Sequence, residues 1–170
     1  DAQAAAWYRK AAEKGHTAAA GLLGSRYLTG NGVAKDDKQA AEWFAKAAAK
    51  GDAFAQYNLG LLYNLGRGVP QDRARSLDLL TKAAEQGRLS AQYLLYSLYA
   101  QGRNGVPQDD KQASYWLTKA AEQGDPRAEY NMAVRYRTGR GVEKDDAKAI
   151  EWLKKAAAHE TSASVLAQYD

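Results

Sequence analysis

Few residues of this chain are of a type that could carry out chemistry. The chain has two histidines, His16 and His159, and no cysteine, which excludes thiolate catalysis, disulfides and cysteine-based zinc sites. A histidine can serve as a general acid or base near neutral pH. These two lie far apart in the chain, each near an expected helix end. We therefore interpret both as exposed or capping residues.

Three pairs of adjacent aspartates could suggest a cation site. The pairs are Asp36-Asp37, Asp109-Asp110 and Asp145-Asp146. Each stands at the expected start of a helix, where the first aspartate can cap the helix and the helix dipole favours the second. We therefore expect no metal site here, and we expect no cofactor.

Runs of Gly-x-Gly, such as Gly30-Asn31-Gly32 and Gly139-Arg140-Gly141, are similar to parts of nucleotide-binding loops. Phosphate-binding loops follow strands, whereas these runs follow expected helices. The chain has no His-Glu-x-x-His or Gly-x-Ser-x-Gly motif, and no serine has a lysine three residues later. We expect no catalytic residues and predict that the protein is not an enzyme.

The glycine runs belong to an internal repeat that spans the chain. A Gly-Val pair begins at Gly32, Gly68, Gly105 and Gly141, with spacings of 36, 37 and 36 residues. An aspartate follows each valine by three residues, and an Ala-Ala pair recurs in the same register. Tryptophans precede four of these alanine pairs by four residues: Trp7, Trp43, Trp116 and Trp152. This periodicity indicates that the tryptophans are core residues rather than stacking platforms.

These landmarks divide the chain into four full repeats, namely residues 16–51, 52–87, 88–124 and 125–160. A half-repeat, residues 1–15, precedes them, and a partial repeat or capping helix, residues 161–170, follows. We interpret residues 1–170 as a single domain. The sequence leaves open whether this domain is a whole protein or a segment of a longer array. Since His159-Glu160 replaces the usual closing glycine, we expect the array to change there.

Each repeat is predicted to contain two helices joined by a short turn. The first helix, such as residues 53–65, carries an apolar stripe on one face: Ala55, Leu59, Leu62 and Tyr63. Gly66 and Gly68 then end that helix, and Asp72 stands where the second helix needs an N-cap.

The second helix is likewise apolar on one face, which in the first repeat is Ala40, Trp43, Phe44, Ala47 and Ala48. Gln39 and Gln112 follow the capping aspartate by three residues, as in a capping box. One helix pair cannot cover its own apolar face, so neighbouring pairs must stack. The expected fold is all-α: a right-handed α-α superhelix, or α-solenoid, of antiparallel helix pairs with 36-residue repeats.

The repeat resembles a known family. The matching segments are Ala55-Gln56-Tyr57-Asn58-Leu59-Gly60, Gly66-Arg67-Gly68-Val69, Asp72 and Lys82-Ala83-Ala84. They are similar to the Sel-one-like repeat (SLR), a subclass of the tetratricopeptide-like α-solenoids, over essentially the whole chain. The resemblance implies a scaffold or adaptor that binds a partner protein or peptide on its concave face, lined by the first helices. It also suggests a bacterial periplasmic or secreted protein, although no leader is visible and a cytoplasmic location stays open.

Residues that the repeat does not require are the candidates for partner binding. On the first helices they occupy the third, sixth, tenth and thirteenth repeat positions, and they include a ladder of tyrosines. The candidates are Phe54, Tyr57, Leu61, Asn64, Tyr93, Arg127, Tyr130 and Arg137, together with Tyr96, which replaces a small residue. The tyrosines suit recognition, but they could instead pack between repeats. Phe54, Leu61 and Leu65 could form an exposed apolar patch.

Charge and hydropathy restrict the partner. The net charge is +4, from 24 basic and 20 acidic residues spread along the chain, so we expect no nucleic-acid partner. No apolar run is long enough to span a bilayer, so we expect no membrane insertion, and we expect a monomer. The alternative function is binding of cell-wall fragments or β-lactam hydrolysis, as proposed for cysteine-rich cousins, and it would need polar side chains that converge in a pocket.

Overall fold

In a computed structural model of the chain, the second helix of each repeat begins at an aspartate. The side chain of Asp72 accepts a hydrogen bond of 2.9 Å from the backbone N–H of Arg75. Three further aspartates cap in the same way: Asp36, Asp109 and Asp145. Gln39 does not complete a capping box, because its amide donates to Glu42 instead.

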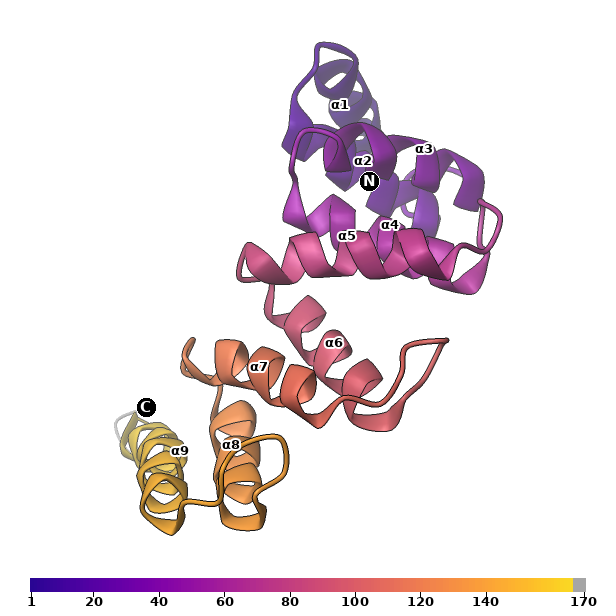
Figure 1. Cartoon of the computed structure of the whole chain (residues 1–170). Coiled ribbons are helices and arrows are strands. Elements are labelled where there is room, and N and C mark those ends of the chain that lie inside the picture. The colour runs from indigo at the N-terminus through magenta and orange to yellow at the C-terminus, as the bar shows by residue number, and fades with distance from the viewer. Residues whose placement is uncertain (167–170) are drawn as a thin grey trace. The chain divides into compact units, whose positions relative to one another are not determined.

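The structure describes the backbone of residues 1–166 and the side chains of residues 1–159, and this part of the chain contains nine helices and no strand (Figure 1). The helices are α1 (Ala2–Glu13), α2 (Thr17–Thr29), α3 (Asp37–Ala48), α4 (Ala53–Leu65), α5 (Arg73–Glu85), α6 (Leu89–Gln101), α7 (Asp110–Ala121), α8 (Pro126–Thr138) and α9 (Asp146–Leu166). The first helices of the four repeats are α2, α4, α6 and α8. The predicted all-α class is confirmed.

The helices pack as consecutive pairs. Helix α2 packs on α3, α4 on α5, and α8 on α9. Helices α1, α3 and α7 also contact the first helix that follows each of them. These contacts divide the chain into two compact parts, which we call the N-terminal unit (Asp1–Ala91) and the C-terminal unit (Gln92–Asp170). Each is described by itself below.

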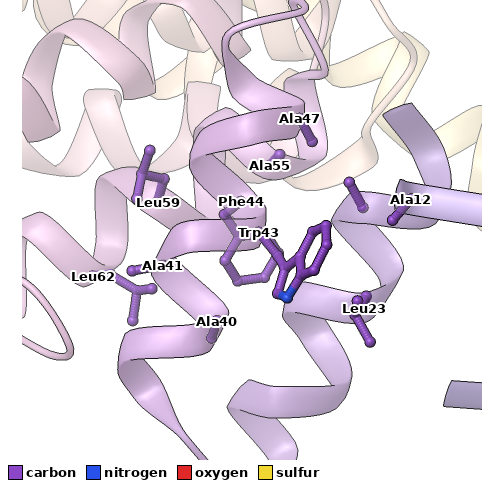
Figure 2. Close-up of a cluster of buried hydrophobic side chains, with 11 residues drawn as sticks. Ala12, Leu23, Ala40, Ala41, Trp43, Phe44, Ala47, Ala55, Leu59 and Leu62 are labelled. Atoms are coloured by element: carbon purple, nitrogen blue, oxygen red, sulfur yellow. The ribbon is translucent and has the colours of Figure 1, made fainter. Parts of the chain in front are cut away.

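The core of the N-terminal unit consists of small alanines around a few large side chains. Phe44 and Leu23 are fully buried, and Trp43 lies beside them (Figure 2). The cluster is completed by Ala12, Ala20, Ala40, Ala41, Ala47, Ala55, Leu59 and Leu62. Burial of a side chain such as Leu23 or Phe44 stabilises the fold by roughly 1.5–3 kcal/mol. The predicted stripes of both helices therefore face this core.

The prediction that all four tryptophans are core residues is wrong for Trp7. Trp43 and Trp116 are 8% and 5% exposed, Trp152 is half-buried, and Trp7 is 69% exposed. Trp43 is covered by side chains of the two helices that precede it, α1 and α2. Trp7 lies on α1, the first of the described helices, and its ring is mostly exposed.

The Gly-Val turn also joins one repeat to the next. Gly68 has a φ of +70°, and a Cβ there would collide with the backbone carbonyl of Asp37, at the start of α3. Arg67, beside it, donates to the Asp37 carboxylate through Nη2 at 2.8 Å and Nε at 3.0 Å. This hydrogen bonding lowers the pKa of Asp37. The turn is therefore an inter-repeat contact as well as a helix stop.

Helix α9 continues past residue 160 to Leu166 without a turn. The last residues of the expected partial repeat, 167–170, lie outside the described residues. The extent of that partial repeat stays a prediction.

Candidate partner-binding face

Four candidate residues of the N-terminal unit share one stripe of α4. Phe54, Tyr57, Leu61 and Asn64 follow one another at three- and four-residue steps, and all four are half-buried. Phe54 also packs edge-on against Phe44, with ring centroids 6.0 Å apart, and borders the core cluster. Of the expected exposed apolar patch, Leu65 is exposed, whereas Phe54 and Leu61 are half-buried and Phe54 packs against the core.

Arg88 lies against the same stripe, although sequence reasoning did not single it out. Its guanidinium carbon is 5.0 Å from the Phe54 ring centroid and 4.9 Å from that of Tyr57. Its Nε is buried without a hydrogen-bond partner in the described part of the chain. The two rings thus hold a cation whose hydrogen-bonding capacity is not fully used.

In the C-terminal unit, Tyr93 links its own repeat to the next one. Its hydroxyl donates a 2.5 Å hydrogen bond to the carboxylate of Asp125, which caps α8. Burial and this bond raise the pKa of Tyr93. Burial alone would raise the pKa of Asp125 too, but hydrogen bonds from Tyr93 and from the Ala128 backbone outweigh it, and that pKa is lowered. Tyr93 therefore has a structural task, and a role in partner binding stays a proposal.

Arg127 stacks over the same tyrosine and remains open to solvent. Its guanidinium carbon lies 5.5 Å from the Tyr93 ring centroid, and its Nη2 is 3.9 Å from a carboxylate oxygen of Asp125. Its side chain is 80% exposed, so this ion pair contributes little to stability and leaves most donors free.

Tyr96 lies beside a buried arginine that the sequence analysis missed. Arg135 donates to Ser114 Oγ at 3.0 Å and to the carbonyls of Asp110 and Arg140 at 3.2 and 3.0 Å. The centroid of the Tyr96 ring is 5.2 Å from the Arg135 guanidinium carbon. Of the two interpretations left open for Tyr96, these contacts favour packing over protrusion into a groove.

Like Arg127, the other two candidates on α8, Tyr130 and Arg137, are exposed to solvent. Tyr130 is 55% exposed, and Arg137 is exposed as well. Tyr130 lines an open pocket of about 560 Å³ between α8 and α9, with Arg127, Asn131, Leu153 and small residues around it.

The first helices differ from the rest of the chain in charge. Helices α2, α4, α6 and α8 carry four arginines: Arg26, Arg127, Arg135 and Arg137. They carry a single acidic residue, Glu129, which is 4% exposed. The solvent-facing surface of these helices is therefore aromatic, neutral or basic.

A comparison of register positions could have found both missed arginines. Arg88 occupies the position of the capping residues Asp52 and Asp125, and Arg135 that of Leu62, Leu98 and a second arginine, Arg26. A cation in place of a neighbour's cap or core leucine is visible in the sequence. What each cation contacts, however, is a property of the tertiary structure.

Within the described residues, no group of three or more His, Cys, Asp or Glu side chains is placed to hold a metal ion. No helix in that part of the chain has the length and apolar character needed to cross a membrane.

The stacked helix pairs and their open aromatic surfaces define a helical repeat protein. The family model of the Sel1 repeat matches residues 1–16, 17–52, 53–87, 89–125 and 126–160. The chain belongs to the Sel1 repeat family, whose members are generally non-catalytic helical scaffolds that mediate protein–protein interactions.

Solved structures of bacterial proteins are similar to this chain. A protective antigen of uropathogenic Escherichia coli strains with an SLR fold is 43% identical, with a TM-score of 0.78 over 90% of this chain. A Sel1 repeat protein from Oxalobacter formigenes is 37% identical, with a TM-score of 0.84 over 100% of this chain. Cysteine-rich protein B of Helicobacter pylori is 25% identical, with a TM-score of 0.52 over 73% of this chain and 88% of its own.

This chain spans 32% of the length of the Escherichia coli antigen and 49% of that of the Oxalobacter protein. A search of curated protein sequences finds no match.

Proposed function

We propose that the chain is a protein-interaction scaffold that binds a partner protein or peptide on the surface of its first helices, the concave face in this family. The observation that carries the proposal is the composition of that surface. Its exposed and half-buried side chains include Tyr57, Tyr130, Arg127 and Arg137, and the four helices expose no carboxylate. Tyrosine and arginine are the residue types enriched where binding energy is concentrated.

Charge determines the kind of partner that suits this surface. A surface that combines arginines with tyrosines and carries no exposed carboxylate attracts acidic segments and repels basic ones. Three of the second helices differ, because each carries an aspartate within its first turn: Asp37, Asp110 and Asp146. A partner is therefore expected to distinguish the first helices from the second.

A quantitative crosslinking pull-down from the native organism tests the proposal. The test variant combines Arg127→Ala and Tyr130→Ala on α8. The matched control combines Lys119→Ala and Tyr115→Ala, which remove an exposed cation and an exposed tyrosine from the second helix α7. We expect the test variant to recover at least about tenfold less partner than the unmodified chain does, as for loss of an interface anchor.

Equal recovery by the two variants would show that the first helices do not form the binding surface. Reduced recovery by the control alone would move the binding surface to the second helices. Circular dichroism of both variants checks that each remains folded.

The finer assignments belong to the same proposal. We propose that the protein acts as a monomer or as a segment of a longer array, in the bacterial periplasm or outside the cell. Localisation of the endogenous protein by cell fractionation tests the compartment. A signal confined to the cytoplasm would contradict it.

A further inference from the structure

One repeat has an arginine where its neighbours have a capping aspartate. Asp52 caps α4 by accepting a hydrogen bond from the Ala55 backbone at 2.7 Å, and Asp125 caps α8 in the same way. In the repeat between them, that position is Arg88, immediately before α6. This repeat therefore contributes a positive charge where its two neighbours contribute a negative one, while the first repeat has His16 there.

The C-terminal unit shows what a carboxylate does at that place. The Asp125 carboxylate accepts hydrogen bonds from Tyr93 at 2.5 Å and from the backbone N–H groups of Arg127 and Ala128 at 3.1 and 2.9 Å. Tyr93 is the ladder tyrosine of the preceding repeat. The Asp125 carboxylate thus lies beside both the Tyr93 hydroxyl and the guanidinium of Arg127, which stacks on the Tyr93 ring.

In the N-terminal unit, the equivalent tyrosine meets a guanidinium instead. Tyr57 occupies the register position of Tyr93, and the Arg88 guanidinium lies over its ring at 4.9 Å. Within the described residues Arg88 has no ion pair, and its buried Nε has no acceptor. A cation that is partly removed from water and lacks an acceptor gains from a carboxylate that reaches it.

The two aromatic rings also hold the arginine in place. Phe54 and Tyr57 both contact its guanidinium, whose carbon lies 5.0 and 4.9 Å from their ring centroids. A planar guanidinium stacked on rings loses less conformational freedom on binding than a free lysine would, and it presents a fork that matches a carboxylate.

We propose that Arg88, clamped by Phe54 and Tyr57, is an anchor for the carboxylate of an aspartate or glutamate side chain in an extended acidic segment of the partner. This inference rests on the proposed scaffold function and adds the chemical class of the partner. The expected occupant is an acidic polypeptide because Arg88 is a cation without an ion pair in the described residues. The helix whose rings it contacts, α4, carries no carboxylate that could neutralise it.

The test uses a fluorescein-labelled peptide of alternating aspartate and glycine and the same peptide with asparagine in place of aspartate. Both are titrated into the full chain and followed by fluorescence anisotropy. The variants are Arg88→Gln, Arg88→Lys and a control, Arg73→Gln, which removes one exposed cation from the same unit. The Nε–H resonance of Arg88 in a nitrogen-15 spectrum reports changes in the environment of the guanidinium, because a peptide carboxylate would reach the Nη atoms rather than the shielded Nε.

We expect the aspartate peptide to bind, the asparagine peptide to bind at least about tenfold more weakly, and the Arg88 Nε–H resonance to shift only with the former. Arg88→Gln should weaken the aspartate peptide by a similar factor and Arg88→Lys by less, whereas Arg73→Gln should leave it nearly unchanged. Equal affinities for Arg88→Gln and Arg73→Gln, an unshifted Nε–H resonance, or no binding of the aspartate peptide to the unmodified chain would each overturn the anchor.

A native partner separates this inference from the proposed function. One outcome of the pull-down is that the Arg88→Gln variant recovers as much partner as the unmodified chain while the Arg127→Ala, Tyr130→Ala variant recovers much less. In that outcome Arg88 is not an anchor and the scaffold function stands. If no first-helix variant affects recovery, the proposed function fails as well.

Discussion

Tyr57, Tyr93 and Tyr130 share one register position, yet each has a different environment. Tyr93 donates to Asp125, Tyr57 lies under Arg88, and Tyr130 is more than half exposed. For Tyr57 and Tyr93, the difference comes from the residue that the following repeat places beside the ring, Arg88 or Asp125. A tyrosine ladder is therefore partly structural, and only the structure tells which of its members is open to a partner.

Replacement of Tyr93 by phenylalanine tests the structural role of its hydroxyl. The Asp125 pKa is lowered in the folded protein, so its stabilisation is present above the unfolded value of about 3.9 and is lost as the pH falls through the folded pKa. We expect Tyr93→Phe to lower the free energy of unfolding by about 1–2 kcal/mol at pH 7, and by less as the pH falls through the folded pKa of Asp125.

Urea denaturation at several pH values measures this difference, and Tyr130→Phe is the control because its hydroxyl makes no hydrogen bond within the described residues. The Tyr93 pKa is raised by burial and by Asp125, so its contribution is present below the unfolded value of about 10 and is lost as the pH rises through the folded pKa. The alkaline loss should thus be absent in Tyr93→Phe. A pH-independent difference would contradict the assignment.

At the scale of elements, the Gly-Val turn combines two requirements. It must end a first helix with left-handed backbone, and it must let that turn approach the start of an earlier second helix. Gly68 meets both requirements against Asp37, whereas Gly51 has a φ of +85° and no atom within 4 Å of the place where a Cβ would stand. Alanine substitutions at these two glycines therefore separate the energetic cost of the left-handed backbone from the cost of lost contact between repeats.

We predict that Gly68→Ala is more destabilising than Gly51→Ala. Gly51→Ala should cost about 1–2 kcal/mol, the penalty for a left-handed alanine. Gly68→Ala should cost at least about 2 kcal/mol more, because the new methyl group forces the turn away from α3 and weakens the Arg67–Asp37 ion pair. Chemical denaturation of the full chain measures both, and equal costs would show that the turn is only a helix stop.

At the scale of the whole molecule, the energetic value of a repeat residue depends on its place in the chain. Trp7 and Trp43 occupy the same register position, but side chains of two preceding helices cover only Trp43. The repeat pattern describes which residue recurs, and the neighbouring repeats determine whether it is buried.

We predict that Trp43→Ala lowers the free energy of unfolding by about 3–5 kcal/mol, as expected for a large buried ring. Trp7→Ala should lower it by less than about 1 kcal/mol, since the ring is mostly in water and contacts Lys10 at the surface. Thermal and urea denaturation of the two variants compare them directly. Similar losses would mean that Trp7 is covered in solution.

Much of the architecture was predictable from the sequence because its determinants are local. Asp72 caps the next helix, Gly66 ends the previous one, and the stripe around Leu59 faces the core, and each follows from spacing along a single chain segment. These features recur in every repeat. Their register therefore predicted the helices and the all-α class, both of which the structure confirms.

What a side chain contacts across repeats was decided only by the tertiary structure. Arg88 and Arg135 both replace a residue that is aspartate or leucine in neighbouring repeats, yet one lies against two rings and the other is hydrogen-bonded in the core. Trp7 repeats the position of Trp43 but lacks its cover. The physical reason is that burial, ion pairing and stacking depend on atoms from a neighbouring repeat, and the local pattern that forms a helix does not specify them.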